Sequence, residues 1–142
     1  MIALGVIVFV AISVLLARFL QIENVERDTE VALIQAQARG DANAMLGRLS
    51  GCRQSSSCVA AVEANVANPR LRRKGEVKIL QLTSPTSYAL FGASGRTRLA
   101  WTVIGTLPVV QCVTVRRTGN FLSGIHLQLT ALSAPIPNEG DC

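Results

Sequence analysis

The chain has 142 residues, a formal net charge of +5 and a hydrophobic fraction of 49%. This length is enough for one ordinary domain with a continuous core, which needs no metal to fold. Aromatic residues make up only 4% of the chain and do not alternate with the basic residues, so the composition argues against nucleic acid as a partner.

The N-terminal stretch is apolar. Residues 2–17 carry no charge, and Arg18 follows them. As a helix, residues 2–20 would extend about 28 Å, close to the roughly 30 Å of a bilayer core. We therefore expect residues 1–21 to form a transmembrane signal anchor, with the lipid bilayer as the partner of residues 2–20. No small-x-small cleavage site follows the apolar run, so we expect the anchor to stay attached.

Helices are expected next. Residues 22–39 carry an apolar stripe at helical spacing, whereas Glu26 and Glu30 lie off that stripe. The stripe consists of Ile22, Val25, Thr29, Ala32, Leu33 and Ala36. Gly40 is expected to end this helix, and Asp41 to cap a second one over residues 42–49. A third helix is predicted over residues 58–67, capped by Ser56 or Ser57 and ended by Pro69.

From Lys74 onward the apolar residues alternate with a period of two, which is typical of strands. We expect strands over residues 76–83, 87–91, 96–104, 109–117 and 122–132, joined by turns at 84–86, 92–95, 105–108 and 118–120. Helices followed by a run of strands indicate an α+β fold. We predict two or three helices packed on a curved antiparallel sheet of four to five strands, with Leu99, Trp101 and Val103 buried. The exported domain would cover residues 22–133, and residues 134–142 would form a tail tied by a disulfide.

Four cysteines permit three pairings, and they are Cys52, Cys58, Cys112 and Cys142. Cys52 and Cys58 bracket a short polar loop and form a natural small ring, which leaves Cys112 to pair with Cys142. Zinc is disfavoured because no C-x-x-C pair is present and the chain has one histidine. We therefore predict two disulfides, no metal and no cofactor.

The orientation of the chain follows from these cysteines. Disulfides persist only in an oxidising compartment, so we expect a single-pass membrane protein whose C-terminal domain lies outside the cytoplasm. Arg18 and Arg27, which follow the apolar run, favour the opposite orientation under the positive-inside rule.

The order of elements over residues 22–133 resembles the cone-shaped superfamily named after nuclear transport factor two, also called cystatin-like. Membrane-anchored members of that superfamily serve in bacterial secretion and lipid-import systems. Its dehydratases and isomerases use Asp, His or Tyr inside the cone, and the matching residue types here are Asp41, Tyr88 and His126. The resemblance implies a cavity that Trp101 and His126 would line.

The chain is also similar to type IV pilins. It has a hydrophobic N-terminal helix running into an amphipathic one, then a sheet and a C-terminal disulfide loop. Gly5 stands where mature pilins usually carry glutamate. The resemblance implies a filament subunit that polymerises through its N-terminal helix.

Basic residues suggest a binding patch, although a solvated rim would have the same composition. The candidates are Arg70, Arg72, Arg73, Lys74, Arg116 and Arg117. No sequence motif of a hydrolase, a zinc protease or a phosphate-binding loop is present. We therefore expect a non-enzymatic envelope protein that binds or scaffolds within a membrane-associated assembly, with a protein partner or a homo-oligomer. A pilin-like subunit and a small cavity enzyme using His126 are the alternatives.

Overall fold

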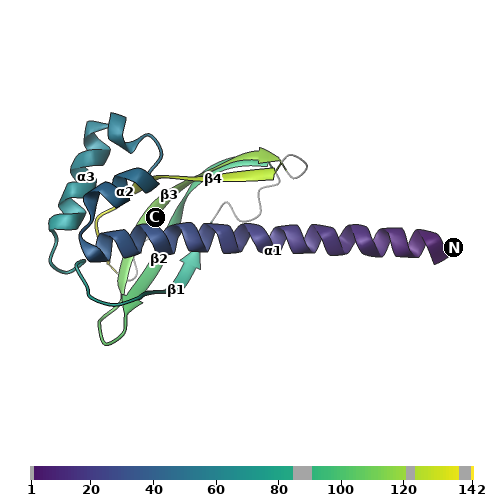
Figure 1. Ribbon diagram of the computed structural model, residues 1–142, viewed down its shortest axis with the longest axis horizontal. Helices are drawn as coiled ribbons and strands as arrows, with labels where there is room; N and C mark the ends of the chain where they lie inside the picture. The colour runs from purple at the N-terminus through teal and green to yellow at the C-terminus, as the bar shows by residue number, and fades with distance from the viewer. Residues whose placement is uncertain (1, 85–90, 121–123, 138–141) are drawn as a thin grey trace.

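One continuous helix, α1 (Ile2–Arg39), runs the length of the molecule, and a four-stranded sheet packs against its second half (Figure 1). The computed structural model describes residues 2–84, 91–120, 124–137 and 142. The other elements are α2 (Ala42–Arg48), the 3-10 helix η1 (Cys52–Gln54), α3 (Ser56–Ala67), β1 (Val77–Thr83), β2 (Phe91–Val103), β3 (Val109–Asn120) and β4 (Gly124–Leu132). Helices α2 and α3 lie at the end of the molecule away from the N-terminus (Figure 1). The predicted α+β class is therefore correct for the described residues.

The expected transmembrane helix is wrong. Within residues 2–84, 91–120, 124–137 and 142, no helix combines the length and the apolar character that a membrane crossing requires. The single-pass membrane localisation depended on this helix and is wrong as well.

The sheet is an antiparallel meander in the order β1-β2-β3-β4. Its longest pairing joins β2 to β3, from Trp101 opposite Val109 to Phe91 opposite Asn120. The turns predicted at 92–95 and 118–120 are wrong, because these residues lie within the two strands. Their glycines resemble turn residues, but a glycine inside a strand often marks an irregular pairing, and the register shifts between Phe91 and Ala93. Of the strand predicted over 87–91, residues 87–90 lie outside the described part.

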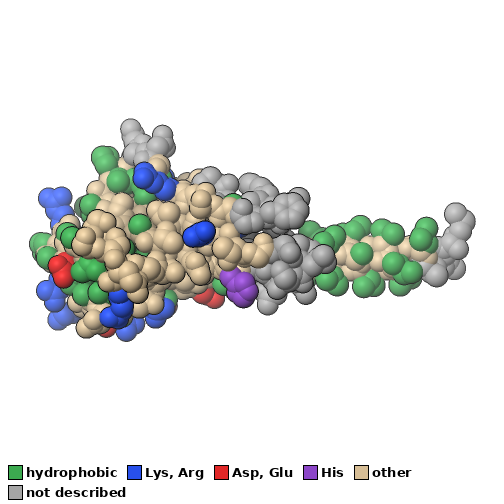
Figure 2. Space-filling model, turned by 90° about the horizontal axis from the view of Figure 1, so that it is seen from above, with side chains coloured by type: hydrophobic (Ala, Val, Ile, Leu, Met, Phe, Trp, Pro, Cys, Tyr) green, Lys and Arg blue, Asp and Glu red, His purple; other side chains and the backbone are tan. Residues whose placement is uncertain are grey.

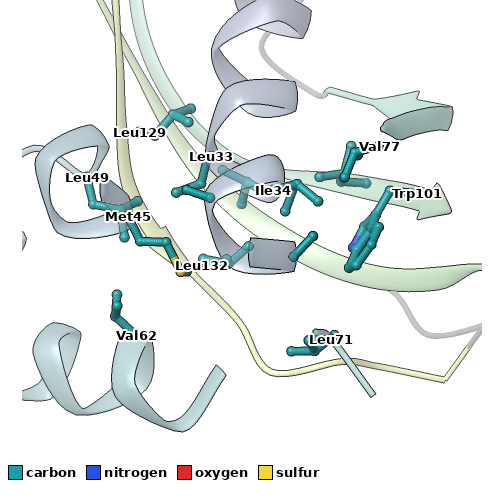
Figure 3. Packing of buried hydrophobic residues seen from close by; sticks show 14 of the residues in the cluster. Leu33, Ile34, Met45, Leu49, Val62, Leu71, Val77, Trp101, Leu129 and Leu132 are labelled. Atoms are coloured by element: carbon teal, nitrogen blue, oxygen red, sulfur yellow. The ribbon is translucent and has the colours of Figure 1, made fainter. Parts of the chain in front are cut away.

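The core lies between α1 and one face of the sheet (Figure 3). Leu99, Trp101 and Val103 of β2 point into it and are at most 3% exposed, as their alternation predicts. The other buried members labelled in Figure 3 come from α1, α2, α3, β1, β4 and the segments that connect them: Leu33, Ile34, Met45, Leu49, Val62, Leu71, Val77, Leu129 and Leu132.

The face of α1 that meets the sheet differs from the predicted apolar stripe. Leu33 and Gln37 are fully buried, and so is Glu30, while Glu26 is 2% exposed. Val25, which belongs to the predicted stripe, is 51% exposed. Residues 26, 30, 33 and 37 share one face at 3.6 residues per turn, so the contact made by the end of α1 carries two glutamates into the interior.

The expected end of α1 and the expected cap of α2 are found, whereas the expected cap of α3 is wrong. Asp41 Oδ1 accepts a hydrogen bond from the Ala44 N–H (2.9 Å) at the start of α2. Helix α3 begins at Ser56 and is capped by Ser55, so the predicted caps Ser56 and Ser57 lie inside the helix. Gly40 ends α1 with a φ of 76°, a conformation that glycine adopts without strain.

Two disulfides join the predicted pairs, Cys52–Cys58 and Cys112–Cys142. The segment after β4 keeps pairing with β3, since the Ser133 N–H donates to Cys112 O (2.9 Å) and the Ile136 N–H to Val110 O (2.8 Å). The second disulfide therefore ties Cys142 to the same part of β3.

We expect the two disulfides to contribute unequally to stability. The bridged residues are 6 apart in the first and 30 apart in the second, and a longer loop removes more entropy from the unfolded chain. Replacing Cys112 and Cys142 by serine should lower the free energy of unfolding by about 4 kcal/mol, and replacing Cys52 and Cys58 by about 2 kcal/mol. Urea denaturation of the two double variants measures both losses, and equal or reversed losses would contradict the loop argument.

Candidate assembly surface

Residues 4–17 of α1 project from the domain without a covering partner among the described residues. Every residue from 4 to 17 is exposed, and the helix extends beyond the sheet as an apolar rod (Figures 1 and 2). Its large apolar side chains are 47–72% exposed: Leu4, Val6, Ile7, Val8, Phe9, Val10, Ile12, Val14, Leu15 and Leu16. We refer to residues 4–17 as the apolar rod.

Such a surface requires a partner. A helix that is apolar on all sides is normally buried, and contiguous exposed apolar patches of this kind mark interaction sites. No residue of the apolar rod carries a charge. Identical rods can therefore approach one another without repulsion, and the apolar side chains on all sides leave room for more than one neighbour.

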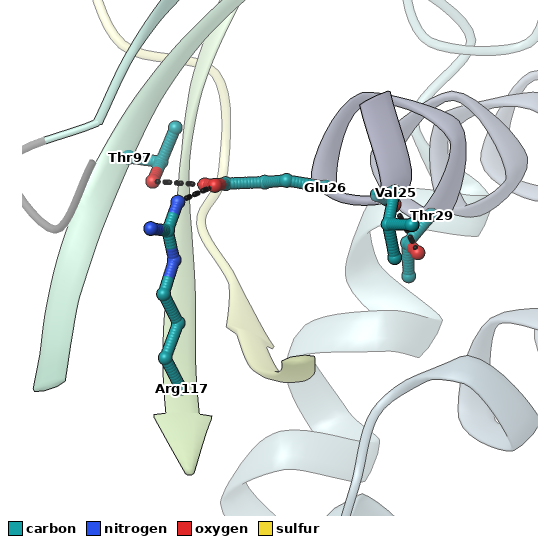
Figure 4. Close-up of polar contacts among 5 residues, drawn as sticks. All are labelled: Val25, Glu26, Thr29, Thr97 and Arg117. Atoms are coloured by element: carbon teal, nitrogen blue, oxygen red, sulfur yellow. Dashed lines mark hydrogen bonds and ion pairs between the residues drawn. The ribbon is translucent and has the colours of Figure 1, made fainter. Parts of the chain in front are cut away.

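A buried ion pair fixes α1 where it enters the domain. Arg117 of β3 pairs with Glu26 of α1, and these residues are 4% and 2% exposed (Figure 4). The Thr97 hydroxyl of β2 donates to the other oxygen of the same carboxylate, Glu26 Oε1, at 3.4 Å (Figure 4). Opposite charges and a hydroxyl donor offset part of the cost of removing this carboxylate from water.

Glu30 lies one turn farther along α1 and is fully buried. Neither of its carboxyl oxygens has a hydrogen-bond partner among the described residues. Burial, reinforced by the nearby Glu26 charge, raises the pKa of Glu30 to about 8, although Arg117 acts in the opposite direction. Glu30 is therefore mainly protonated at neutral pH. The buried group of Glu26, Glu30 and Arg117 then contains one carboxylate and one guanidinium.

A network of buried amides holds the end of α1. Gln111 of β3 accepts hydrogen bonds at Oε1 from Gln37 Nε2 (2.9 Å) and from the indole nitrogen of Trp101 (2.9 Å). Its own Nε2 donates to Ser133 O (2.9 Å). The network therefore links α1, β2, β3 and the segment after β4.

The sequence pattern did not predict that Glu26, Gln37 and Arg117 are buried. Gln37 is spaced correctly for the buried face, four residues after Leu33, but only the folded sheet reveals which amide it meets. Glu26 and Arg117 are 91 residues apart, and each has the composition of a surface position when considered alone.

The predicted cavity residues are not brought together. Trp101 is fully buried and pairs with Val109, whereas His126 is exposed on β4 and pairs with Thr118. Those two partners are nine positions apart along β3, which corresponds to about 30 Å. Tyr88 lies outside the described residues, and Asp41 serves as a helix cap.

The predicted basic patch is reduced to one segment. Arg117 is buried against Glu26 and is not part of the surface. Val109 of β3 lines the same surface groove as Arg70 and Arg73. Arg116 is exposed on β3, but it is seven residues, or about 23 Å, along the strand from Val109. The exposed residues that remain close in sequence are Arg70, Arg72 and Lys74, in the connection between α3 and β1.

Comparisons with profiles of known protein families, with curated proteins and with solved structures found no match. The resemblances to the superfamily of nuclear transport factor two and to type IV pilins therefore stay predictions. Within the described part of the chain, no group of three or more His, Cys, Asp or Glu side chains is placed to hold a metal ion.

We expect Glu30→Gln to stabilise the protein at neutral pH. The folded-state pKa of Glu30, about 8, exceeds its ordinary value of 4.5, so the unfolded state releases the proton first. Stability should fall by on the order of 1 kcal/mol per pH unit as pH rises from 5 to 8, and Gln should remove that slope. The variant should then be about 3 kcal/mol more stable than the wild type at pH 7.

Urea denaturation at pH 5, 6, 7 and 8 measures this effect. Glu63→Gln is the matched control, because Glu63 is exposed on α3, and it should keep the pH dependence of the wild type. If the free energy of unfolding changed with pH in the same way for the wild type and for Glu30→Gln, Glu30 would ionise at its ordinary pKa and the prediction would be wrong.

Proposed function

We propose that this chain is a non-enzymatic scaffolding subunit that assembles with copies of itself through the apolar rod, as a pilin-like filament subunit does. The observation that carries the proposal is the exposure of 14 consecutive uncharged residues, 4–17, on all sides of α1. A single flat partner would cover one side of the rod only, whereas a bundle of identical rods covers all of them.

The energy available from such a bundle is substantial. Fully burying one large aliphatic or aromatic side chain contributes roughly 1.5–3 kcal/mol, and ten such side chains are exposed on each rod. Part of this gain is offset by the entropy lost on association. Because every copy carries the same surface, head-to-tail contacts between rods can repeat without closing and produce a filament.

The architecture agrees with the plan of a pilin. α1 is one unbroken helix whose second half packs on an antiparallel sheet, and a disulfide joins Cys142 to β3. The arrangement offers little support for the alternative of a cavity enzyme, since the buried amides of Gln37 and Gln111 bond to each other and His126 lies on the surface.

We expect Val10→Asp to abolish assembly. Val10 lies in the middle of the apolar rod and is 53% exposed, so a charge there is harmless in the monomer but would be buried in a bundle. Sedimentation velocity and negative-stain microscopy of the full chain should show polymers for the wild type and monomers for the variant.

Leu80→Asp provides the matched control. Leu80 of β1 is 57% exposed, close to the value for Val10, but it lies on the domain and not on the rod. This variant should polymerise like the wild type. A monomeric wild type, or a Val10→Asp chain that still polymerises, contradicts the proposal.

A further inference from the structure

A second apolar surface lies at the end of the molecule away from the N-terminus. The turn between β2 and β3 is at this end (Figure 1), and its Ile104 and Leu107 are 76% and 83% exposed. Beside it is a groove of about 420 Å³, which is within the usual range of ligand sites, roughly 300–1,000 Å³. The groove is lined by Leu71, Leu107, Val110, Pro135, Arg70 and Arg73, among others.

Arg73 is held rigidly in the wall of this groove. Its guanidinium stacks over Trp101, 5.2 Å from the ring centroid. Nε donates to Arg70 O (3.1 Å), and Nη1 donates to Thr106 Oγ1 (2.7 Å) and to Leu107 O (2.6 Å). These bonds use three of the five N–H donors of an arginine, and Nη2 has no partner among the described residues.

This cation is prepared to receive an anion. Burial lowers the pKa of Arg73 from its ordinary value, which indicates that its charge is partly desolvated, although an arginine stays charged at any working pH. A bound carboxylate would meet a guanidinium whose position is already fixed by three hydrogen bonds and by the contact with Trp101, so little side-chain freedom would be lost on binding.

The surrounding charge favours the same ligand. Arg70 lines the groove, and the exposed Arg72 and Lys74 follow it in the same connection between α3 and β1. None of these cations has a carboxylate within salt-bridge distance among the described residues. Basic side chains also gather at this end of the molecule in Figure 2. An uncompensated positive field around an apolar floor is complementary to a segment that combines carboxylates with apolar side chains.

We propose that this groove binds an extended acidic peptide segment of a partner protein, with an apolar side chain on Leu107, Pro135 and Ile136 and a carboxylate on Arg73 Nη2 and Arg70. The groove is open and has the exposed Leu107 at its rim, so it suits a chain lying across it better than an enclosed small molecule. The inference does not depend on self-assembly, because the groove and the apolar rod lie at opposite ends of α1.

The test uses the full chain and the peptide Asp-Leu-Phe-Glu with blocked ends. Trp101 is the only tryptophan and lies beneath Arg73, so its fluorescence reports on binding in the groove. We expect saturable binding, and about tenfold weaker binding of the uncharged analogue Asn-Leu-Phe-Gln, because the charge-assisted hydrogen bonds are lost. The analogue Asp-Ser-Ser-Glu should also bind more weakly, because it has no apolar anchor.

Variants of two exposed residues test the location of the site. Arg70→Gln and Leu107→Ser should each weaken binding about tenfold without unfolding the chain. The matched controls are Arg48→Gln on α2 and Leu80→Ser on β1, which are exposed elsewhere and should bind like the wild type.

Three results would overturn the inference. They are an absence of peptide binding at millimolar concentration, equal binding of the charged and amide peptides, and unchanged binding in both groove variants. Isovalerate carries a carboxylate and an apolar group without a peptide chain. If it bound as tightly as the peptide, the occupant would be a small organic acid and not a partner protein.

Discussion

The seating of α1 on the sheet is the contact on which the rest of the structure depends. The second half of this helix provides a large part of the core, whereas residues 4–17 of the first half are exposed. The contact is unusually polar for a core, because Glu26 pairs with Arg117 and Gln37 bonds to Gln111. Buried polar groups are costly unless they are satisfied, so these partners allow few other positions of the helix.

The sequence predicts the local features of this fold well and the long-range polar contacts poorly. Alternation along β2 correctly places Leu99, Trp101 and Val103 in the core. Spacing correctly pairs Cys52 with Cys58, which leaves Cys112 to pair with Cys142. In contrast, Glu26 and Arg117 each resemble surface residues, and neither was predicted to be buried. The two wrong assignments have one cause. Each charge is buried only because the other is opposite it, and no periodicity within a single element reveals a partner 91 residues away.

The candidate sites show the same division. Local composition is sufficient to mark residues 4–17 and residues 70–74 as distinctive, and both segments remain prominent in the structure. Composition does not reveal which contacts each side chain makes or whether its position is fixed. Arg73 belongs to a run of basic residues, but stacking on Trp101 and three hydrogen bonds make it a fixed part of the groove wall. Trp101 and His126, grouped by resemblance to a cavity fold, are separated by most of the length of β3.

The buried polar contacts also explain how a projecting rod can have a defined direction. Apolar packing alone tolerates small rotations and shifts of a helix, because the hydrophobic effect is not directional. Hydrogen bonds require particular distances and angles, so the bonds of Glu26 and Gln37 select one rotation of α1 about its axis. Since α1 is one unbroken helix, that rotation extends to residues 4–17 and sets which side of the rod faces away from the sheet. A bundle of such rods would then place every attached domain in the same orientation, which is the geometric condition for a repeating assembly.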